Sequence, residues 1–164
     1  MRIGILSDTH DHREHVLRAI DVLNEQNVEA VFHAGDVISP FVMKQFGDLQ
    51  ARPFIVTYGN NDGEKLILKT AAAKIGATIY EYCYEGEHGG KSIYMAHTQH
   101  HVEAVAQSSR YDLVIYGHTH QQDIRRVGKT LIVNPGEVTD WITGTSHLVI
   151  LDLQSMEPEI IQIK

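Results

Sequence analysis

The chain has 164 residues, of which 43% are hydrophobic and 21% are charged, a composition typical of one compact globular domain, here residues 1–164. Its formal net charge of −7 disfavours non-specific binding to nucleic acid, which needs a basic surface. The single cysteine, Cys83, excludes an intramolecular disulfide and a cysteine-rich zinc site. Eleven histidines are the unusual feature, because neutral imidazole is a common ligand of transition metals.

The first apolar stretch is short. It runs from Ile3 to Leu6 and is followed by Ser7 and Asp8. A stretch of this length is too short for the core of a signal peptide and far too short to span a bilayer. We therefore expect a cytoplasmic protein with no membrane partner.

The first two-thirds of the chain alternate between strand-like and helix-like segments. Apolar runs rich in β-branched or aromatic residues predict buried strands, whereas helical spacing of apolar residues and capping residues predict helices. In chain order we expect a strand at 3–6, a helix within 13–26, a strand at 30–33, a helix opening at Ser39-Pro40, a strand at 54–58, a helix at 64–75, a strand at 93–96, a weaker helix at 100–109 and a strand at 113–116.

From Asp123 onward the pattern changes to short strands joined by tight turns. One turn is predicted at 127–129 and another at 154–157, before the last strand. The whole order predicts an α/β layered fold with an antiparallel C-terminal portion.

Metal-competent side chains follow each of the five predicted strands. Ligands of open α/β sheets bind beyond the carboxyl ends of the strands, so these side chains are expected to converge. In chain order they are Asp8 and His10, then Asp36, Asn60, His97, and finally His118 and His120. Such convergence of carboxylates, imidazoles and one amide is harder to explain by chance than any one motif.

Each motif also has a purely structural interpretation. Asp8-Thr9-His10 taken alone is as compatible with a turn plus helix cap as with a metal site, and most Gly-Asp and Gly-Asn pairs are only turns. His118-Thr119-His120 is a stronger signal, because alternate residues of an extended segment point to one side and can offer two imidazoles to adjacent ions. Taken together, the motifs favour a metal site.

The pattern does not assign a single role to the remaining histidines. His33 could hydrogen-bond within the core or orient a ligand, and His100 could reach a bound substrate or begin a solvated helix. The other histidines, which are not expected to be ligands, include His12, His15, His88 and His147.

The types of ligand restrict the metal. Imidazole, carboxylate and amide together suit Mn, Fe, Co, Ni or Zn better than Ca or Mg. Seven ligands are too many for one tetrahedral ion, so we expect two divalent ions with one bridging carboxylate. Such a centre attracts a small phosphorylated substrate and activates a water for attack on phosphorus.

The order Asp8-x-His10, Gly35-Asp36, Gly59-Asn60-x-Asp62, His97 and Gly117-His118-x-His120 resembles the calcineurin-like metallophosphoesterases. The short length and the Asn134-Pro135-Gly136 segment are most similar to the small prokaryotic YfcE-like phosphodiesterase branch. The resemblance implies a four-layer α/β/β/α sandwich of two mixed β-sheets flanked by helices, and a binuclear site usually filled with manganese. It also implies one metal held by Asp8, His10, Asp36 and His120, and a second held by Asp36, Asn60, His97 and His118.

Two departures from the family pattern affect the expected chemistry. Many members have histidine where this chain has Asn61, and asparagine can donate a hydrogen bond but cannot supply a proton near neutral pH. We therefore predict a phosphodiesterase rather than a phosphomonoesterase, with Asp36 and Asn61 as catalytic residues. The second departure is Thr98-Gln99-His100 after His97, so His100 joins Asn61 as a predicted substrate contact.

Three other functions compete with this interpretation. A non-catalytic scaffold resembling the retromer subunit of this fold is disfavoured because all seven ligand positions are filled. A serine or cysteine hydrolase is disfavoured because the chain has no Gly-x-Ser-x-Gly turn and Cys83 has no activating partner in the sequence. A nucleotide-binding switch is disfavoured because the chain has no Gly-x4-Gly-Lys-Ser/Thr loop. The sequence leaves open the substrate, the metal used and whether the chain forms a homo-oligomer.

Overall fold

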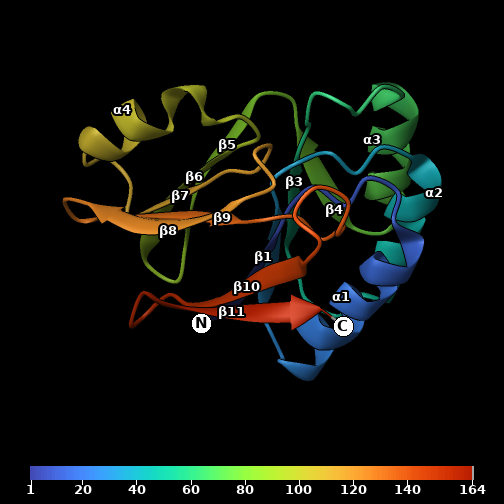
Figure 1. The fold of residues 1–164 in the computed structure, drawn as a ribbon, viewed down its shortest axis with the longest axis horizontal. Coiled ribbons are helices and arrows are strands. Elements are labelled where there is room, and N and C mark those ends of the chain that lie inside the picture. Colours follow the sequence, from blue (N-terminus) through green and yellow to red (C-terminus); the bar gives the residue numbers. More distant parts are fainter. Residues whose placement is uncertain (164) are drawn as a thin grey trace.

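Residues 1–163 are described by the computed structural model, in which two β-sheets lie face to face (Figure 1). The first sheet has six strands. Their order is β11 (Glu157–Ile163), β10 (Ser146–Asp152), β1 (Arg2–Leu6), β2 (Ala30–His33), β3 (Phe54–Thr57) and β4 (Ala77–Tyr80). Strands β1 to β4 are parallel, whereas β10 runs antiparallel to β1 and β11 runs antiparallel to β10.

The second sheet has five strands and is also mixed. Their order is β5 (Cys83–His88), β6 (Lys91–Ala96), β7 (Leu113–Ile115), β9 (Thr130–Pro135) and β8 (Gln122–Val127). Strands β6, β7 and β9 are parallel to one another, and β5 and β8 are antiparallel edge strands.

Helices cover the outer faces of both sheets. On the six-stranded sheet lie α1 (Arg13–Glu25), α2 (Pro40–Met43), the 3₁₀ turn η1 (Lys44–Asp48) and α3 (Lys65–Lys74). On the five-stranded sheet lie the 3₁₀ turn η2 (Gln99–His101) and α4 (Val102–Gln107). Figure 1 shows α4 on the opposite side of the molecule from α1, α2 and α3.

The core has a separate apolar layer for each interface. The layer between the sheets includes Ile5 and Phe32 from one sheet and Ile93 and Val133 from the other. Strands β1 to β3 are central and parallel, and their residues after Arg2 are fully buried, because both faces are covered. The predicted four-layer α/β/β/α sandwich is confirmed.

Most predicted elements are present, with ends displaced by a few residues. Ser39 caps α2 as predicted, since its hydroxyl accepts a hydrogen bond from the amide of Val42, but the α-helix lasts four residues before it tightens into η1. Strands β4 and β5 were not among the predicted strands. Within residues 1–163, no helix has the length and apolar character to cross a bilayer.

Candidate metal centre

All seven predicted ligands lie together at one edge of the sandwich. The carboxyl ends of the parallel strands of both sheets meet at this edge. Asp8 and His10 follow β1, Asp36 follows β2, Asn60 follows β3, His97 follows β6, and His118 and His120 follow β7. The packing of the two sheets therefore brings together residues as far apart in the chain as Asp8 and His120.

The first group of ligand atoms joins Asp8, His10 and His120. The Nε2 atoms of the two histidines lie 3.2 Å apart, and each lies close to the same carboxylate oxygen of Asp8, at 3.6 Å from His10 and 3.5 Å from His120. Three donor atoms that face one another at these distances could hold one divalent ion.

The second group joins Asp8, Asp36 and His97. The Oδ2 atom of Asp36 lies 3.4 Å from His97 Nε2 and 3.6 Å from His10 Nε2, so it touches both groups. The Oδ1 atom of Asn60 lies 2.9 Å from His97 Nε2. This geometry suits a carboxylate shared between two ions.

His118 is the least closely placed of the seven. Its ring centroid lies 5.1 Å from that of His97, and its backbone amide donates a hydrogen bond to Asp8 Oδ2 at 2.9 Å. The prediction that the segment through His120 is extended is wrong, because His118 and His120 have φ values of 68° and 61°. The two imidazoles are consequently directed to different parts of the site, and only His120 joins the first group.

Left-handed backbone is concentrated at the ligand positions. Besides the two histidines after β7, Asp8, His10 and Asp36 have φ values of 54°, 38° and 59°. Each such conformation costs a non-glycine residue about 1–3 kcal/mol and persists only where its surroundings enforce it. Strain of this kind is a frequent property of functional sites.

Glycines allow the loops to approach one another closely. A Cβ on Gly59 would overlap the carboxylate of Asp36, and a Cβ on Gly117 would overlap Ser7 and lie 2.8 Å from Asp8 Oδ2. Any larger residue would push the strand-end loops apart.

Two imidazoles are held in the tautomer that a metal requires. His97 Nδ1 donates to the carbonyl of Ala34 at 2.7 Å, and His120 Nδ1 donates to the buried carboxylate of Glu137 at 2.7 Å. In a neutral imidazole, the proton on Nδ1 leaves the lone pair on Nε2. The Nε2 atoms of both rings therefore face the site as acceptors.

Asp62 supports the loops on the six-stranded sheet. Its Oδ2 accepts hydrogen bonds from the amides of Asp36 and Gly59 at 3.0 and 2.7 Å, and its Oδ1 accepts from the amide of Ile38 at 2.7 Å. The side chain is 2% exposed, and burial raises its pKa more than these hydrogen bonds lower it. Asp62 thus fixes the loops after β2 and β3 relative to each other.

The donor set fits a cation. Asp8 Oδ1 is buried and has no hydrogen-bond partner in residues 1–163, although an unpartnered buried carboxylate oxygen is costly. Asn60 Oδ1, which can only accept, faces His97 Nε2. A positive charge between these atoms would satisfy both arrangements.

The charge balance of the site is visible in its pKa values. Burial disfavours charge on His10 and His97, but the carboxylates of Asp8 and Asp36 outweigh burial and raise the pKa of both imidazoles. Burial likewise opposes charge on Asp36, but His97 and Asn61 hold its pKa well below the usual range. The site therefore favours bound positive charge, either protons or metal ions.

The other predicted residues lie around this centre. Asn61 donates to Asp36 through its backbone and its side chain, each at 2.8 Å. His33 is fully buried and bonds Thr9 Oγ1 at 3.2 Å. His100 is exposed on η2, and its neighbour His101, rather than His100, lines the cavity beside His97.

Residues outside the predicted set also shape the site. Glu137 orients His120, and Asn134 donates from its side chain to the carbonyl of Gly117 at 2.9 Å, which holds the loop after β7. Glu137 directly follows the Asn134-Pro135-Gly136 motif of the family, and this position is the one signal in the sequence that could identify it.

Comparisons with known proteins agree with this geometry. A family model described as the calcineurin-like phosphoesterase superfamily domain matches residues 1–156. A phosphodiesterase of Methanocaldococcus jannaschii is 41% identical over 160 residues, which cover 96% of each chain. A solved archaeal phosphodiesterase superposes with a TM-score of 0.94 at 40% identity over 99% of both chains. The phosphoesterase YfcE of E. coli shares the fold, with a TM-score of 0.72 at 16% identity over the whole of both chains.

Proposed function

Since this chain belongs to the calcineurin-like phosphoesterase superfamily and is a metal-dependent phosphoesterase, we propose that it hydrolyses phosphodiesters at a pair of divalent ions. The observation that carries the proposal is the shared position of Asp36, whose Oδ2 lies within 3.6 Å of an imidazole nitrogen in each ligand group. A second support is the phosphodiesterase activity named for the relative that is 41% identical.

Each proposed ligand set extends one group of donor atoms, and Asp8, which belongs to both groups, is assigned to the first set. Asp8, His10, Asp36 and His120 would hold one ion, and Asp36, Asn60, His97 and His118 would hold the other. When bound, the ions would polarise phosphate oxygens and make a water molecule acidic enough to act as a nucleophile. Manganese is the proposed ion, because mixed oxygen and imidazole ligands suit it, and Ni, Fe, Co and Zn suit the same donors.

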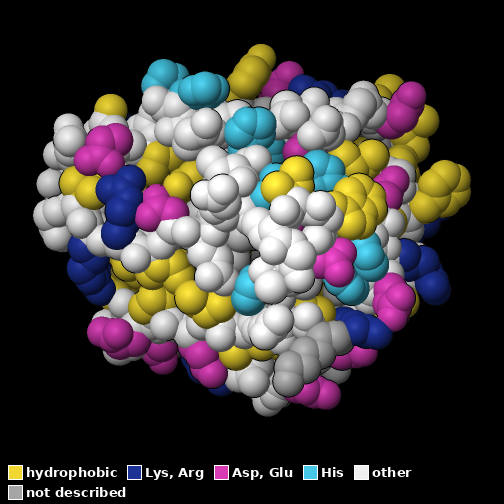
Figure 2. All heavy atoms as spheres, in the orientation of Figure 1, with side chains coloured by type: hydrophobic (Ala, Val, Ile, Leu, Met, Phe, Trp, Pro, Cys, Tyr) yellow, Lys and Arg dark blue, Asp and Glu magenta, His cyan; other side chains and the backbone are white. Residues whose placement is uncertain are grey.

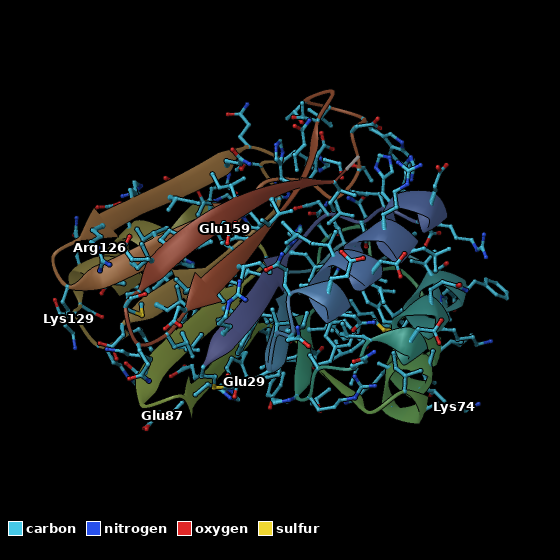
Figure 3. The ribbon with its side chains drawn as sticks, turned by 90° about the horizontal axis from the view of Figure 1, so that it is seen from below. Glu29, Lys74, Glu87, Arg126, Lys129 and Glu159 are labelled. Carbon is cyan, nitrogen blue, oxygen red and sulfur yellow. The ribbon has the colours of Figure 1, made fainter. Side chains whose placement is uncertain are left out.

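The protein side chains cannot by themselves attract a phosphate. Asp8 and Asp36 are anionic, and no lysine or arginine lines the cavities next to the site in residues 1–163. Seen from below, Arg126 and Lys129 lie at the β8–β9 end of the molecule and Lys74 at the opposite end (Figure 3). Two divalent ions would give the centre a charge of about +2 and so supply the attraction.

Asn61 supports diester over monoester chemistry. Its amide donates to Asp36, so it positions the shared carboxylate at the same time as it borders the open side of the site. Asparagine supplies no proton to a leaving group near neutral pH. A diester or a good leaving group tolerates this absence better than an alkyl monoester does.

The test compares an aryl phosphodiester with the matching aryl phosphomonoester. Purified protein is stripped of metal, loaded in turn with Mn, Ni, Fe, Co or Zn, and assayed with bis(para-nitrophenyl) phosphate and para-nitrophenyl phosphate. We expect faster turnover of the diester, best with manganese, and loss of turnover in His118→Ala. Faster turnover of the monoester would contradict the proposed diester preference, and absence of turnover with every ion would contradict the proposed function.

A further inference from the structure

A cavity of about 460 Å³ opens directly beside the metal centre. It is lined by His10, Asp11, Ile38, Asn61 and Trp141. Its volume lies within the roughly 300–1,000 Å³ usual for small-molecule sites. Because His10 and Asn61 belong to the metal centre, a substituent of a phosphate bound there would extend into this cavity.

Trp141, the only tryptophan in the chain, is exposed. Its side chain is 63% exposed, and its ring centroid lies 6.1 Å from that of His10 and 5.9 Å from that of His12. Figure 2 shows hydrophobic and histidine side chains gathered where the loop after β9 crosses this face in Figure 1. An exposed indole ring beside the metal centre offers a flat apolar surface on which part of a ligand can pack.

The loop that carries Trp141 is held by the same carboxylate that orients a predicted metal ligand. Glu137 accepts hydrogen bonds from the amides of Ile142 and Thr143 at 3.0 and 2.6 Å, and from His120 at 2.7 Å. The position of Trp141 is thereby fixed relative to the metal centre.

Ile38, the second apolar residue of the lining, is also tied to the centre. Ile38 has a φ of 81°, a left-handed conformation that a β-branched residue adopts only under constraint. The constraint is Asp62, which accepts from the amide of Ile38 at 2.7 Å and from the amide of Asp36 at 3.0 Å. Both apolar residues of the lining are therefore positioned by buried carboxylates of the site.

The lining indicates the chemical class of the bound group. Trp141 and Ile38 provide flat and aliphatic apolar surfaces, while Asp11 disfavours an anionic group. The adjacent Asn61 can hydrogen-bond ring nitrogens or oxygens. A planar, uncharged ring satisfies all of these groups, because an aromatic side chain stacks on any ring with a π face.

We propose that Trp141 and Ile38 form a subsite that binds a planar, uncharged ring attached to the phosphate, such as a nucleobase or an aryl group. The proposal rests on the proposed function, because it names the class of ester substituent that the same site accepts. Trp141 stacks on the ring in this subsite, and Ile38 provides a second apolar contact.

Binding of a nucleotide tests the subsite without turnover. Titration calorimetry of the zinc-loaded protein compares adenosine monophosphate with ribose phosphate, which carries the same phosphate but no ring. We expect adenosine monophosphate to bind roughly tenfold more tightly than ribose phosphate, because stacking of one base on an aromatic side chain contributes about that much affinity. Because Trp141 is the only tryptophan, its fluorescence should also change saturably with adenosine monophosphate, at the dissociation constant found by calorimetry.

Three variants separate stacking from a general effect on folding. In Trp141→Ala the two ligands should bind equally, with the affinity for ribose phosphate unchanged, whereas Trp141→Phe should keep most of the preference. Phe41→Ala removes another exposed aromatic ring, 76% exposed on α2, and should change neither affinity.

Equal binding of the two ligands by the wild-type protein, or no binding of adenosine monophosphate, would overturn the subsite. A preference retained in Trp141→Ala would overturn it as well. Hydrolysis of aryl diesters together with any of these results would leave the proposed function standing. A ring preference without diester turnover would instead support the subsite and contradict the proposed function.

Discussion

The six-stranded sheet brings oxygen ligands to the centre, whereas the five-stranded sheet brings only imidazoles. Asp8, Asp36 and Asn60 follow strands of the first sheet, together with one histidine, His10. The ligands on the second sheet are His97, His118 and His120. The six-stranded sheet supplies only one imidazole and the five-stranded sheet supplies no oxygen ligand, so the full set of seven donors depends on the apolar packing between the sheets.

The two halves are also supported differently. The carboxylates of the six-stranded sheet accept from backbone amides, such as that of His118 on Asp8 and that of Asn61 on Asp36. The imidazoles of the five-stranded sheet donate to acceptors, which are Ala34 for His97 and Glu137 for His120. Backbone amide donors thus stabilise the negative charge of the carboxylate ligands, whereas carbonyl and carboxylate acceptors orient the imidazole ligands.

The largest expected effect comes from the carboxylate that touches both ligand groups. Asp36→Asn should lower binding of both ions and reduce diester turnover by at least about a thousandfold, since metal ions supply several kcal/mol of transition-state stabilisation. Metal analysis and kcat/KM measure the change, with Asp21→Asn as an exposed control on α1. Near-normal turnover in Asp36→Asn would place the reaction elsewhere.

A smaller effect is expected from the acceptor that orients one imidazole. Glu137→Gln should weaken binding of the ion held by His120 by about 10- to 100-fold, the usual effect of losing such a partner, and leave the other ion bound. Calorimetric titration with manganese distinguishes the two ions. The control is Glu159→Gln, whose side chain is exposed on β11 (Figure 3). Equal weakening of both ions would mean that the two halves are not separately supported.

Replacing the amide that contacts Asp36 should change selectivity rather than abolish turnover. Asn61→His places a group that can donate a proton beside the site, and we expect it to raise monoester turnover relative to diester turnover by roughly tenfold, less than a fully positioned general acid provides. Rates for both aryl substrates at saturating manganese measure the ratio. If neither rate rises, the assigned role of Asn61 is wrong.

A further expected effect is on stability rather than turnover, and it concerns the buried His33. Burial lowers the pKa of His33 to about 4, so the unfolded chain binds more protons than the folded chain between about pH 6.5 and 4. Its contribution to stability is therefore lost as the pH falls through this window, by up to about 1.4 kcal/mol per pH unit.

Urea unfolding of the metal-free protein across that pH range tests this sign. His33→Gln should show a weaker fall in the free energy of unfolding than the wild type does. Comparing the two proteins isolates the contribution of His33 to the pH dependence of stability. His10 and His97 contribute with the opposite sign, because their raised pKa values favour the folded state as the pH falls. If the free energy of unfolding of His33→Gln fell as steeply with pH as that of the wild type, the lowered pKa of His33 would be contradicted.

The strand-end ligands were predictable because a buried strand has a local hydrophobic pattern and its end has a fixed place in the sheet. Strand β5 escaped prediction because it is an edge strand whose charged residues are largely exposed. The backbone conformation of His118 and His120 could not be inferred, since it depends on Asn134, which lies more than ten residues away and ties down the loop.

The supporting carboxylates depend still more on tertiary structure. Asp62 was part of the recognised motif, but its role depends on amides contributed by loops after two different strands. Glu137 and Trp141 belong to a segment without helical or strand periodicity, and their importance follows from where that loop meets the centre.

The proposed chemistry rests on the claim that two ions share Asp36. Electron paramagnetic resonance of the manganese-loaded protein, combined with metal analysis, tests it most directly. The claim predicts two manganese ions per chain with an exchange-coupled spectrum that disappears in Asp36→Asn. A single ion per chain, or two ions with no magnetic coupling, would contradict it.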